Sequence, residues 1–287
     1  GIIIGNIFGI KDNMKDGISF AEKKILSLAI VLMGAQLNAS ILDLIDYRMF
    51  FILVLVIATS LLSAFCLGKL FKMKSSLSIL LGVGNGICGS SAIAASSSVT
   101  GSNEQETGIS IAVINILGAF GIFLLPSLIT FFGIEGIYNQ GLVIGGTIQA
   151  VGQVTAAGFI MGDEVGKFAT LIKMVRILML GPMILILGVL FKNKKNKENK
   201  MSIFHVPGFI LGFILLSILV SMNFIPQNFI GPLNNLSKYF LIIAMSAIGL
   251  NVSLSFILDK GLKVISVALI TFLIQIFVCL FLTGYLL

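Results

Sequence analysis

Long apolar segments recur from one end of the chain to the other, and they constrain its fold more than any other feature. Ten can be delimited, at 1–10, 25–42, 49–71, 77–98, 107–133, 137–160, 166–191, 205–225, 237–256 and 262–287. A membrane-spanning helix needs about 20 consecutive apolar residues. Charged residues make up only 11% of the chain, whereas a soluble domain carries roughly 25%. The sequence therefore predicts a single polytopic transmembrane domain over 1–287, an all-α membrane protein of about ten helices.

The first apolar segment is too short to cross a bilayer, and residue 1 is a glycine instead of a methionine. We therefore expect that one or more N-terminal spans are missing from this sequence. No signal peptide is evident.

The distribution of Lys and Arg predicts the orientation of these segments. When the connecting loops are numbered in chain order, the odd loops carry 14 Lys and Arg residues and the even loops carry 3. Cytoplasmic loops are enriched in these residues, so the odd loops, including the lysine-rich 192–200, are predicted to be cytoplasmic and the C-terminus to lie outside. The net charge of +7 is thus spread over loops. This favours a multi-pass protein of the cell inner (cytoplasmic) membrane and gives no reason to expect a nucleic acid partner.

An internal repeat relates the second and ninth segments. When 28–46 is aligned with 241–259, six of nineteen positions are identical, including Leu37-Asn38-x-Ser40 with Leu250-Asn251-x-Ser253. Seven crossings would separate the two copies, so they would run antiparallel. Inverted repeats of this kind are typical of secondary transporters.

The fourth segment contains four glycines between Gly82 and Gly89, followed by a run of serines. Each glycine costs a helix about 1 kcal/mol relative to alanine, so this density predicts a helix that breaks inside the membrane. The half-helix beginning near Ser90 would then present free N–H groups and the positive end of its dipole, which favours an anion. The alternative is a face of small residues for close helix packing.

The sixth and seventh segments carry polar residues that are costly in a bilayer. Gln149 and Gln153 are four residues apart, so we predict that they share one helical face. They either line a site or hydrogen-bond between helices for assembly. Lys173 and Arg176 share a face of the next segment, and no acidic residue lies at matching depth within the spans. Intramembrane cations usually face a cavity; the alternative is snorkelling to the outer headgroups.

At these same stretches the sequence resembles the YeiH-like family of bacterial inner-membrane proteins, which are described as sulfate exporters. The matching stretches are Gly84-Asn-Gly-Ile-Cys-Gly-Ser-Ser-Ala-Ile-Ala-Ala95, Gln153-Val-Thr-Ala-Ala-Gly158 and Lys173-Met-Val-Arg176. The resemblance covers essentially the whole chain. It implies an inverted-repeat bundle with crossed broken helices, similar to the sodium/proton antiporter and bile-acid symporter folds. Relatives often carry His where Gln149 stands and an acidic residue where Ala150 stands, so proton coupling at that position is not expected here.

Together these features predict a secondary transporter that moves a small anion, sulfate or sulfonate-like, by alternating access. Arg176 and Lys173 would supply charge, the break and its serines would supply donors, and the glutamines would orient the substrate. The candidate substrate-binding residues are Asn85, Gly86, Cys88, Ser90, Ser91, Gln149, Gln153, Lys173 and Arg176.

Two other classes of function stay open. An anion channel would need the same cations without gating by a broken helix. The membrane subunit of an enzyme complex is disfavoured because no His or carboxylate is evident beside Cys88 or the serines. No catalytic residue, cofactor or metal ligand is therefore expected, and the three cysteines are interpreted as small packing residues. The expected partners are the anion and the lipid bilayer, with a homo-oligomer left open.

Overall fold

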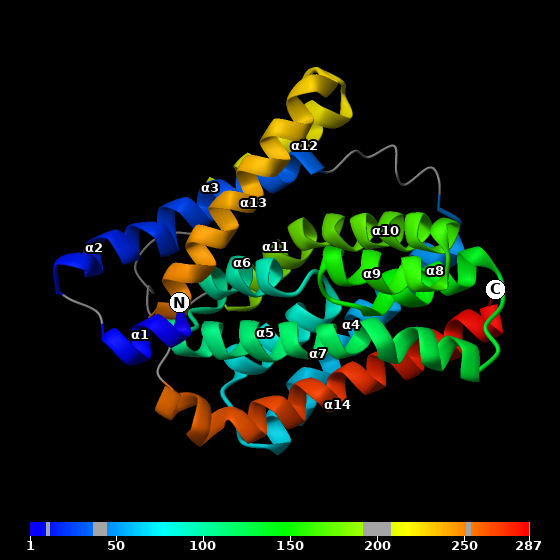
Figure 1. Cartoon of the computed structure of the whole chain (residues 1–287), viewed down its shortest axis with the longest axis horizontal. Coiled ribbons are helices and arrows are strands. Elements are labelled where there is room, and N and C mark those ends of the chain that lie inside the picture. Colours follow the sequence, from blue (N-terminus) through cyan, green and yellow to red (C-terminus); the bar gives the residue numbers. More distant parts are fainter. Residues whose placement is uncertain (10–11, 37–44, 192–207, 251–253, 287) are drawn as a thin grey trace.

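The computed structural model describes residues 1–9, 12–36, 45–191, 208–250 and 254–286, and all regular elements within these ranges are helical. Figure 1 shows their arrangement. In chain order they are α1 (Ile2–Phe8), α2 (Asp12–Phe20), the π-helix η1 (Ala21–Ile25), α3 (Leu26–Met33), the 3-10 turn η2 (Gly34–Gln36), α4 (Tyr47–Leu70), α5 (Ser75–Gly86), α6 (Ser90–Thr100), α7 (Glu104–Phe131), α8 (Ile137–Thr147), α9 (Val151–Met161), α10 (Asp163–Leu178), α11 (Leu180–Leu190), α12 (Gly208–Ser221), α13 (Gln227–Leu250) and α14 (Leu254–Leu286).

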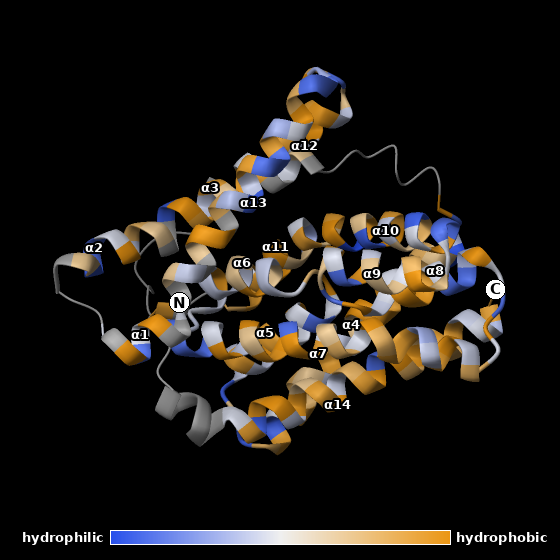
Figure 2. Ribbon diagram, viewed as in Figure 1, coloured by the Kyte–Doolittle hydropathy of each residue, from blue (hydrophilic) through white to orange (hydrophobic). Residues whose placement is uncertain are grey.

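Four stretches of helix in the described ranges are long and apolar enough to cross a membrane: Tyr47–Leu70, Glu104–Phe131, Asp163–Leu190 and Gly261–Leu286. Figure 2 shows apolar residues along most of the length of these helices. Large side chains such as Phe120, Phe123 and Phe281 are exposed there, as expected for a surface that faces lipid. The all-helical membrane character is confirmed, whereas ten spans are not, and the lysine-rich loop 192–200 lies outside the described residues.

The helices form two groups. A core bundle contains α4 to α11 and α14, and a smaller group formed by α3, α12 and α13 projects to one side of it (Figure 1). Within the smaller group Ser237 donates a hydrogen bond to the carbonyl of Ala29 at 2.9 Å. Gly212 lies against Val31, where a larger residue would collide. Much of the predicted sequence repeat, including Asn38 and Asn251, falls outside the described residues.

The fourth apolar segment folds into a helical hairpin. Its arms are α5 and α6, and residues 87–89 form the turn at its tip. Ile93 on the returning arm packs against Gly84 on the first arm. At the base, Ser76 donates to Glu106 at the start of α7, so the chain leaves the hairpin at the end of the bundle where it entered. The predicted break is confirmed, but a single membrane span over 77–98 is not.

The sixth apolar segment forms a second hairpin, from α8 and α9, with residues 148–150 at its tip. Both arms pack along α10. Gly141 of α8 lies against Phe168, and Gly158 of α9 lies against Gly166, so the two arms run in opposite directions beside the same part of α10. An arm of 11 residues is about 17 Å long, too short for a hydrocarbon core of about 30 Å. A single membrane span over 137–160 is therefore not confirmed either.

The two hairpins enter the bundle from opposite ends. The first has its base at the end that holds Lys74 and Glu106, here called the Lys74 end. The second hairpin has its base near Ile134, which lies close to Gly284 on α14. Arg48 donates to the carbonyl of Leu286 at this same end of the bundle, which is here called the Arg48 end. Helix α7 runs between the two ends, and α10 with α11 runs back. The hairpin tips therefore meet near the middle of the bundle.

The base of the first hairpin is fixed by an acidic residue. Glu106 is 3% exposed and forms an ion pair with Lys74 at 2.8 Å. It also accepts from Ser76 and from the backbone N–H of Asn103, whose side chain caps α7 in return. Hydrogen bonding and charge attraction from Glu106 raise the pKa of Lys74. This cluster holds α5 against α7 at the Lys74 end.

Candidate functional site at the hairpin tips

Lys173 and Arg176 lie between the two hairpin tips. Both project from α10, which packs along the second hairpin, and both are 0% exposed. A bare charge at such a position costs several kcal/mol unless it is paired. No carboxylate pairs with either of them among the described residues. Backbone carbonyls accept the hydrogen bonds of both side chains instead.

The carbonyls come from the ends of α5 and α8, the first arm of each hairpin. Arg176 donates from Nη2 to Asn85 O at 2.7 Å, from Nε to Gly86 O at 3.0 Å, and from Nη1 to Gly145 O and Ile148 O, each at 3.0 Å. These atoms carry the negative end of each helix dipole. The guanidinium therefore joins the C-terminal ends of both first arms.

Lys173 repeats this arrangement one turn earlier on α10. Its Nζ donates to Ile87 O at 2.5 Å and to Ile148 O at 2.8 Å, one carbonyl from each tip. Lys has three N–H donors and Arg has five. Each cation therefore retains one N–H that makes no hydrogen bond within the described part of the chain.

The returning arms begin at the same tips. Gly89 caps the start of α6 with φ 70°, a conformation that L-residues with side chains rarely adopt. Cys88 and Ser91 are buried and interact with each other, with 3.0 Å between Sγ and Oγ. Ser90 is half-buried. The first turn of α6 has N–H groups that no carbonyl of the same helix can accept.

Helix α9 begins beside it in the second tip. The N–H of Ala150 donates to Gln153 Oε1 at 3.1 Å, and Gln153 Nε2 donates to Asn115 O at 3.1 Å. Gly152, in the first turn, is exposed, and a Cβ added there would meet nothing within 4 Å. The N-terminal end of α9 is thus bordered by open space, in contrast to the closely packed C-terminal ends of the first arms.

A pair of side-chain amides joins the two tips directly. Gln149 Nε2 donates to Asn85 Oδ1 at 2.8 Å, and Asn85 Nδ2 donates to Ala268 O on α14 at 3.1 Å. Both amides are 0% exposed. Gln149 Oε1 is also buried and has no hydrogen-bond partner among the residues that the structure describes. A buried acceptor without a donor is costly, so this atom marks an incomplete part of the site.

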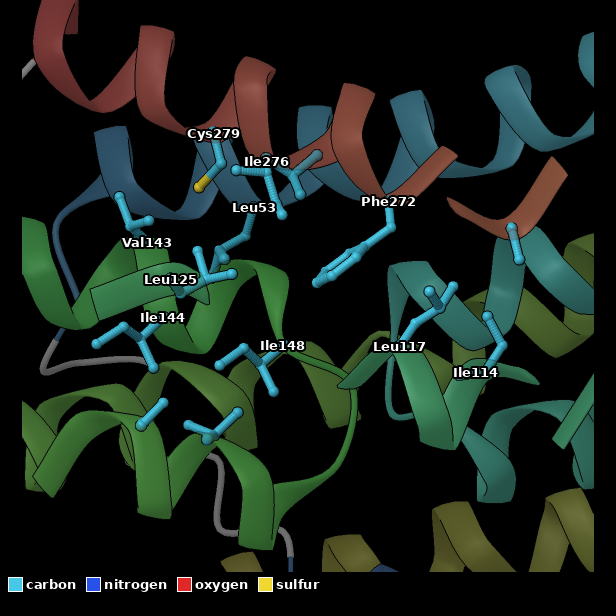
Figure 3. Packing of buried hydrophobic residues seen from close by; sticks show 14 of the residues in the cluster. Leu53, Ile114, Leu117, Leu125, Val143, Ile144, Ile148, Phe272, Ile276 and Cys279 are labelled. Carbon is cyan, nitrogen blue, oxygen red and sulfur yellow. The ribbon is translucent and has the colours of Figure 1, made fainter. Parts of the chain in front are cut away.

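Apolar side chains pack around the second tip. Figure 3 shows Ile148 and Phe272 pointing toward one another within the core. Gly121 of α7 lies opposite both, since a Cβ there would come within 3.3 Å of the Phe272 ring and 3.6 Å of Ile148. The backbone carbonyl of Ile148 faces the cations while its side chain faces this apolar cluster. The tip is therefore held on its apolar side by α7 and α14.

The structure brings all nine predicted site residues to the tips, with one correction to their arrangement. Gln149 and Gln153 do not share a face of one helix: Gln149 lies in the turn, and Gln153 lies in the first turn of α9. Their side-chain oxygens still meet, because both approach the position that a Cβ on Gly118 would occupy. The break at 148–150 was not predicted from the residues themselves; the resemblance implied crossed broken helices without placing the second one.

Sequence reasoning missed the part of the site that α14 contributes. Gln275 is fully buried and donates from Nε2 to Gly146 O and Thr147 O, at 3.3 and 3.2 Å. Its Oε1 and the hydroxyl of Thr271 have no hydrogen-bond partners in the described part of the chain. An isolated glutamine in an apolar span is a usable signal for such a role. No comparable signal marks Gly118.

The charges at the tips sum to a positive value. Each helix end contributes about half an elementary charge, negative at the C-terminal ends of α5 and α8 and positive at the N-terminal ends of α6 and α9. These contributions cancel, which leaves the two cations, about +2 in all. The described residues contain no cluster of three or more His, Cys, Asp or Glu that could hold a metal ion. The arrangement suits an anion better than a metal cation.

These features define the class of the protein as a helical membrane protein with two facing hairpins and a buried cationic centre. The chain belongs to the family described as "Conserved hypothetical protein 698", whose sequence model matches residues 1–268.

Similar proteins occur in several bacteria. A UPF0324 membrane protein of Bartonella henselae is 34% identical over 265 residues, which cover 92% of this chain and 76% of that protein. One from Oceanobacillus iheyensis is 30% identical over 280 residues, 96% of this chain and 82% of that protein. One from Clostridium perfringens is 30% identical over 272 residues, 92% and 79% of the two chains. These names state a membrane protein and no substrate. No solved structure matches the chain.

Proposed function

We propose that this protein is a secondary transporter that moves a small anion across the cytoplasmic membrane by alternating access. The observation that carries the proposal is the centre formed by Lys173 and Arg176. Two cations are buried between the hairpin tips, and within the described part of the chain their hydrogen-bond partners are backbone carbonyls. A positive centre without a carboxylate attracts an anion, and non-helical backbone at this depth is tolerated where it is buried in protein or lines a cavity.

The order of the elements supports a transporter over a channel. The first hairpin is followed by α7, and the second hairpin is followed by α10 and α11, with the two units entering from opposite ends of the bundle. We interpret them as an inverted repeat, in addition to the one suggested between 28–46 and 241–259. Inverted repeats give two related conformations that open to opposite sides. The closely packed tips in this structure fit an occluded site better than an open pore.

Counterflow in proteoliposomes tests the proposal. Vesicles that contain the purified protein are loaded with one unlabelled oxyanion and diluted into the same labelled anion. The panel is sulfate, sulfite, methanesulfonate, hydrogen phosphate and a simple carboxylate. We expect saturable uptake of at least one anion, driven by the internal unlabelled pool. Uptake equal to that of protein-free vesicles for every anion contradicts the proposal, and uptake that neither saturates nor depends on the internal pool favours a channel.

A further inference from the structure

We propose that the anion bound at the hairpin tips is an oxyanion that carries a hydrogen-bond donor of its own, and that bare sulfate is disfavoured. The inference rests on the proposed function and narrows its substrate class. It follows from the direction in which one buried oxygen atom, Gln149 Oε1, is forced to point.

The orientation of the Gln149 amide is fixed by its neighbours. Ala268 O can only accept, so Asn85 must turn its Nδ2 toward it, at 3.1 Å. Asn85 Oδ1 then faces Gln149, which must present its own Nε2, at 2.8 Å. Turning either amide over would place two acceptors or two donors against each other. Gln149 Oε1 is therefore directed away from Asn85, with no partner among the described residues.

This oxygen lies at the N-terminal end of α9. A Cβ built on Gly118 would lie 2.7 Å from Gln149 Oε1 and closer still to Gln153 Oε1, so the two oxygens are neighbours. Gln153 Oε1 accepts from the N–H of Ala150, the residue that caps α9. The start of α6 is also near, because a Cβ on Gly89 would lie 3.4 Å from Gln149 Cβ. This part of the site thus combines helix N-terminal N–H groups with the unsatisfied acceptor of Gln149.

These two kinds of group require different parts of a ligand. The N–H groups at the helix ends favour negatively charged oxygens. A buried amide oxygen repels such atoms and needs an O–H or N–H. Sulfate has only acceptor oxygens. Hydrogen phosphate is also tetrahedral and doubly charged, and it carries one O–H, so it satisfies both. The chemistry therefore points to hydrogen phosphate, phosphonates and sulfonates that bear a hydroxyl or amine.

The comparison of sulfate with hydrogen phosphate tests this inference without any substitution. Titration calorimetry of the purified protein in detergent, at mildly alkaline pH where phosphate carries one proton, measures both affinities. We expect hydrogen phosphate to bind at least about tenfold more tightly, because a site that places a polar group for a substrate hydroxyl strongly rejects an analogue without it. Equal affinities, or tighter binding of sulfate, overturn the inference. Equal affinities are expected if a water molecule donates to Gln149 Oε1, because the ligand then needs no donor of its own.

Two variants locate the selectivity. Gln149→Leu removes the unsatisfied acceptor, so the affinity ratio of the two anions is expected to fall to about one. Ser96→Ala is the matched control, since it also removes a buried oxygen that has no hydrogen-bond partner among the described residues, but it lies in the second half of α6, away from the tips, and should keep the wild-type ratio. A ratio that survives in Gln149→Leu also overturns the inference. A different result contradicts the proposed function itself, namely that no oxyanion binds to the protein or undergoes counterflow.

Discussion

Gln149 and Asn85 meet across the two hairpin tips, where the amide of Gln149 donates to Asn85 Oδ1 at 2.8 Å. The two residues are 64 positions apart in the chain and belong to hairpins that enter from opposite ends of the bundle. Any movement of one hairpin relative to the other must change this bond. Because Arg176 and Lys173 bind the backbone of both tips, the tips are expected to move together with α10 as one unit.

Gly118→Ala is expected to weaken anion binding while the protein still folds and inserts. The new methyl group would collide with the side-chain oxygens of Gln149 and Gln153, which are ends of flexible side chains and can shift. We expect at least about a tenfold loss of affinity, measured by calorimetry. Gly231→Ala is the control, because a Cβ at that helical position of α13 meets nothing within 4 Å. Unchanged affinity in Gly118→Ala would show that the two amides do not contact the anion.

Arg176→Gln is expected to destabilise the protein by about 3–5 kcal/mol, the usual cost of removing one partner from a buried charged network. Four hydrogen bonds to tip carbonyls are lost. Arg176→Lys should restore only part of this stability, because an ammonium cannot reproduce the planar array of donors. Thermal unfolding in detergent measures both variants.

The control for Arg176 lies on the same helix. Lys167 is exposed and pairs with Glu164 at 2.8 Å near the Arg48 end. Exposed pairs of this kind contribute little, so Lys167→Gln should unfold at the wild-type temperature. A wild-type unfolding temperature for Arg176→Gln would mean that its bonds to the tips are not important for stability.

The sequence predicted the components of the site better than their arrangement. The glycine density at 82–89 correctly located a break, and the isolated cations on 166–191 lie between the two hairpin tips. The apolar length of 77–98 and 137–160 misled, because two short arms joined by a turn have the same composition as one spanning helix. Only contacts between distant residues, such as Ser76 with Glu106, reveal the reversal.

Gly89→Ala tests the turn of the first hairpin. Gly89 has φ 70° and ψ −127°, and a residue with a side chain held in such a sparsely populated region costs about 1–3 kcal/mol. We expect a lower unfolding temperature and weaker anion binding, since the start of α6 would move. Gly101→Asn is the control: its φ of 68° and ψ of 27° are left-handed helical, which Asn tolerates. If the two variants are equally stable, the turn at Gly89 is less constrained than the structure indicates.

Cysteine labelling distinguishes two hairpins from two spans, which the charge pattern cannot do. If 77–98 and 137–160 are hairpins instead of spans, only the connections near 101–103 and 132–136 change sides of the membrane. Neither connection carries a Lys or Arg. The count of 14 against 3 is therefore the same for both topologies. In a variant whose own exposed Cys66 is replaced, Ser102→Cys should label from the same side as Lys72→Cys, and Glu135→Cys from the opposite side. Labelling of Ser102→Cys from the side opposite to Lys72→Cys would show that 77–98 crosses the membrane.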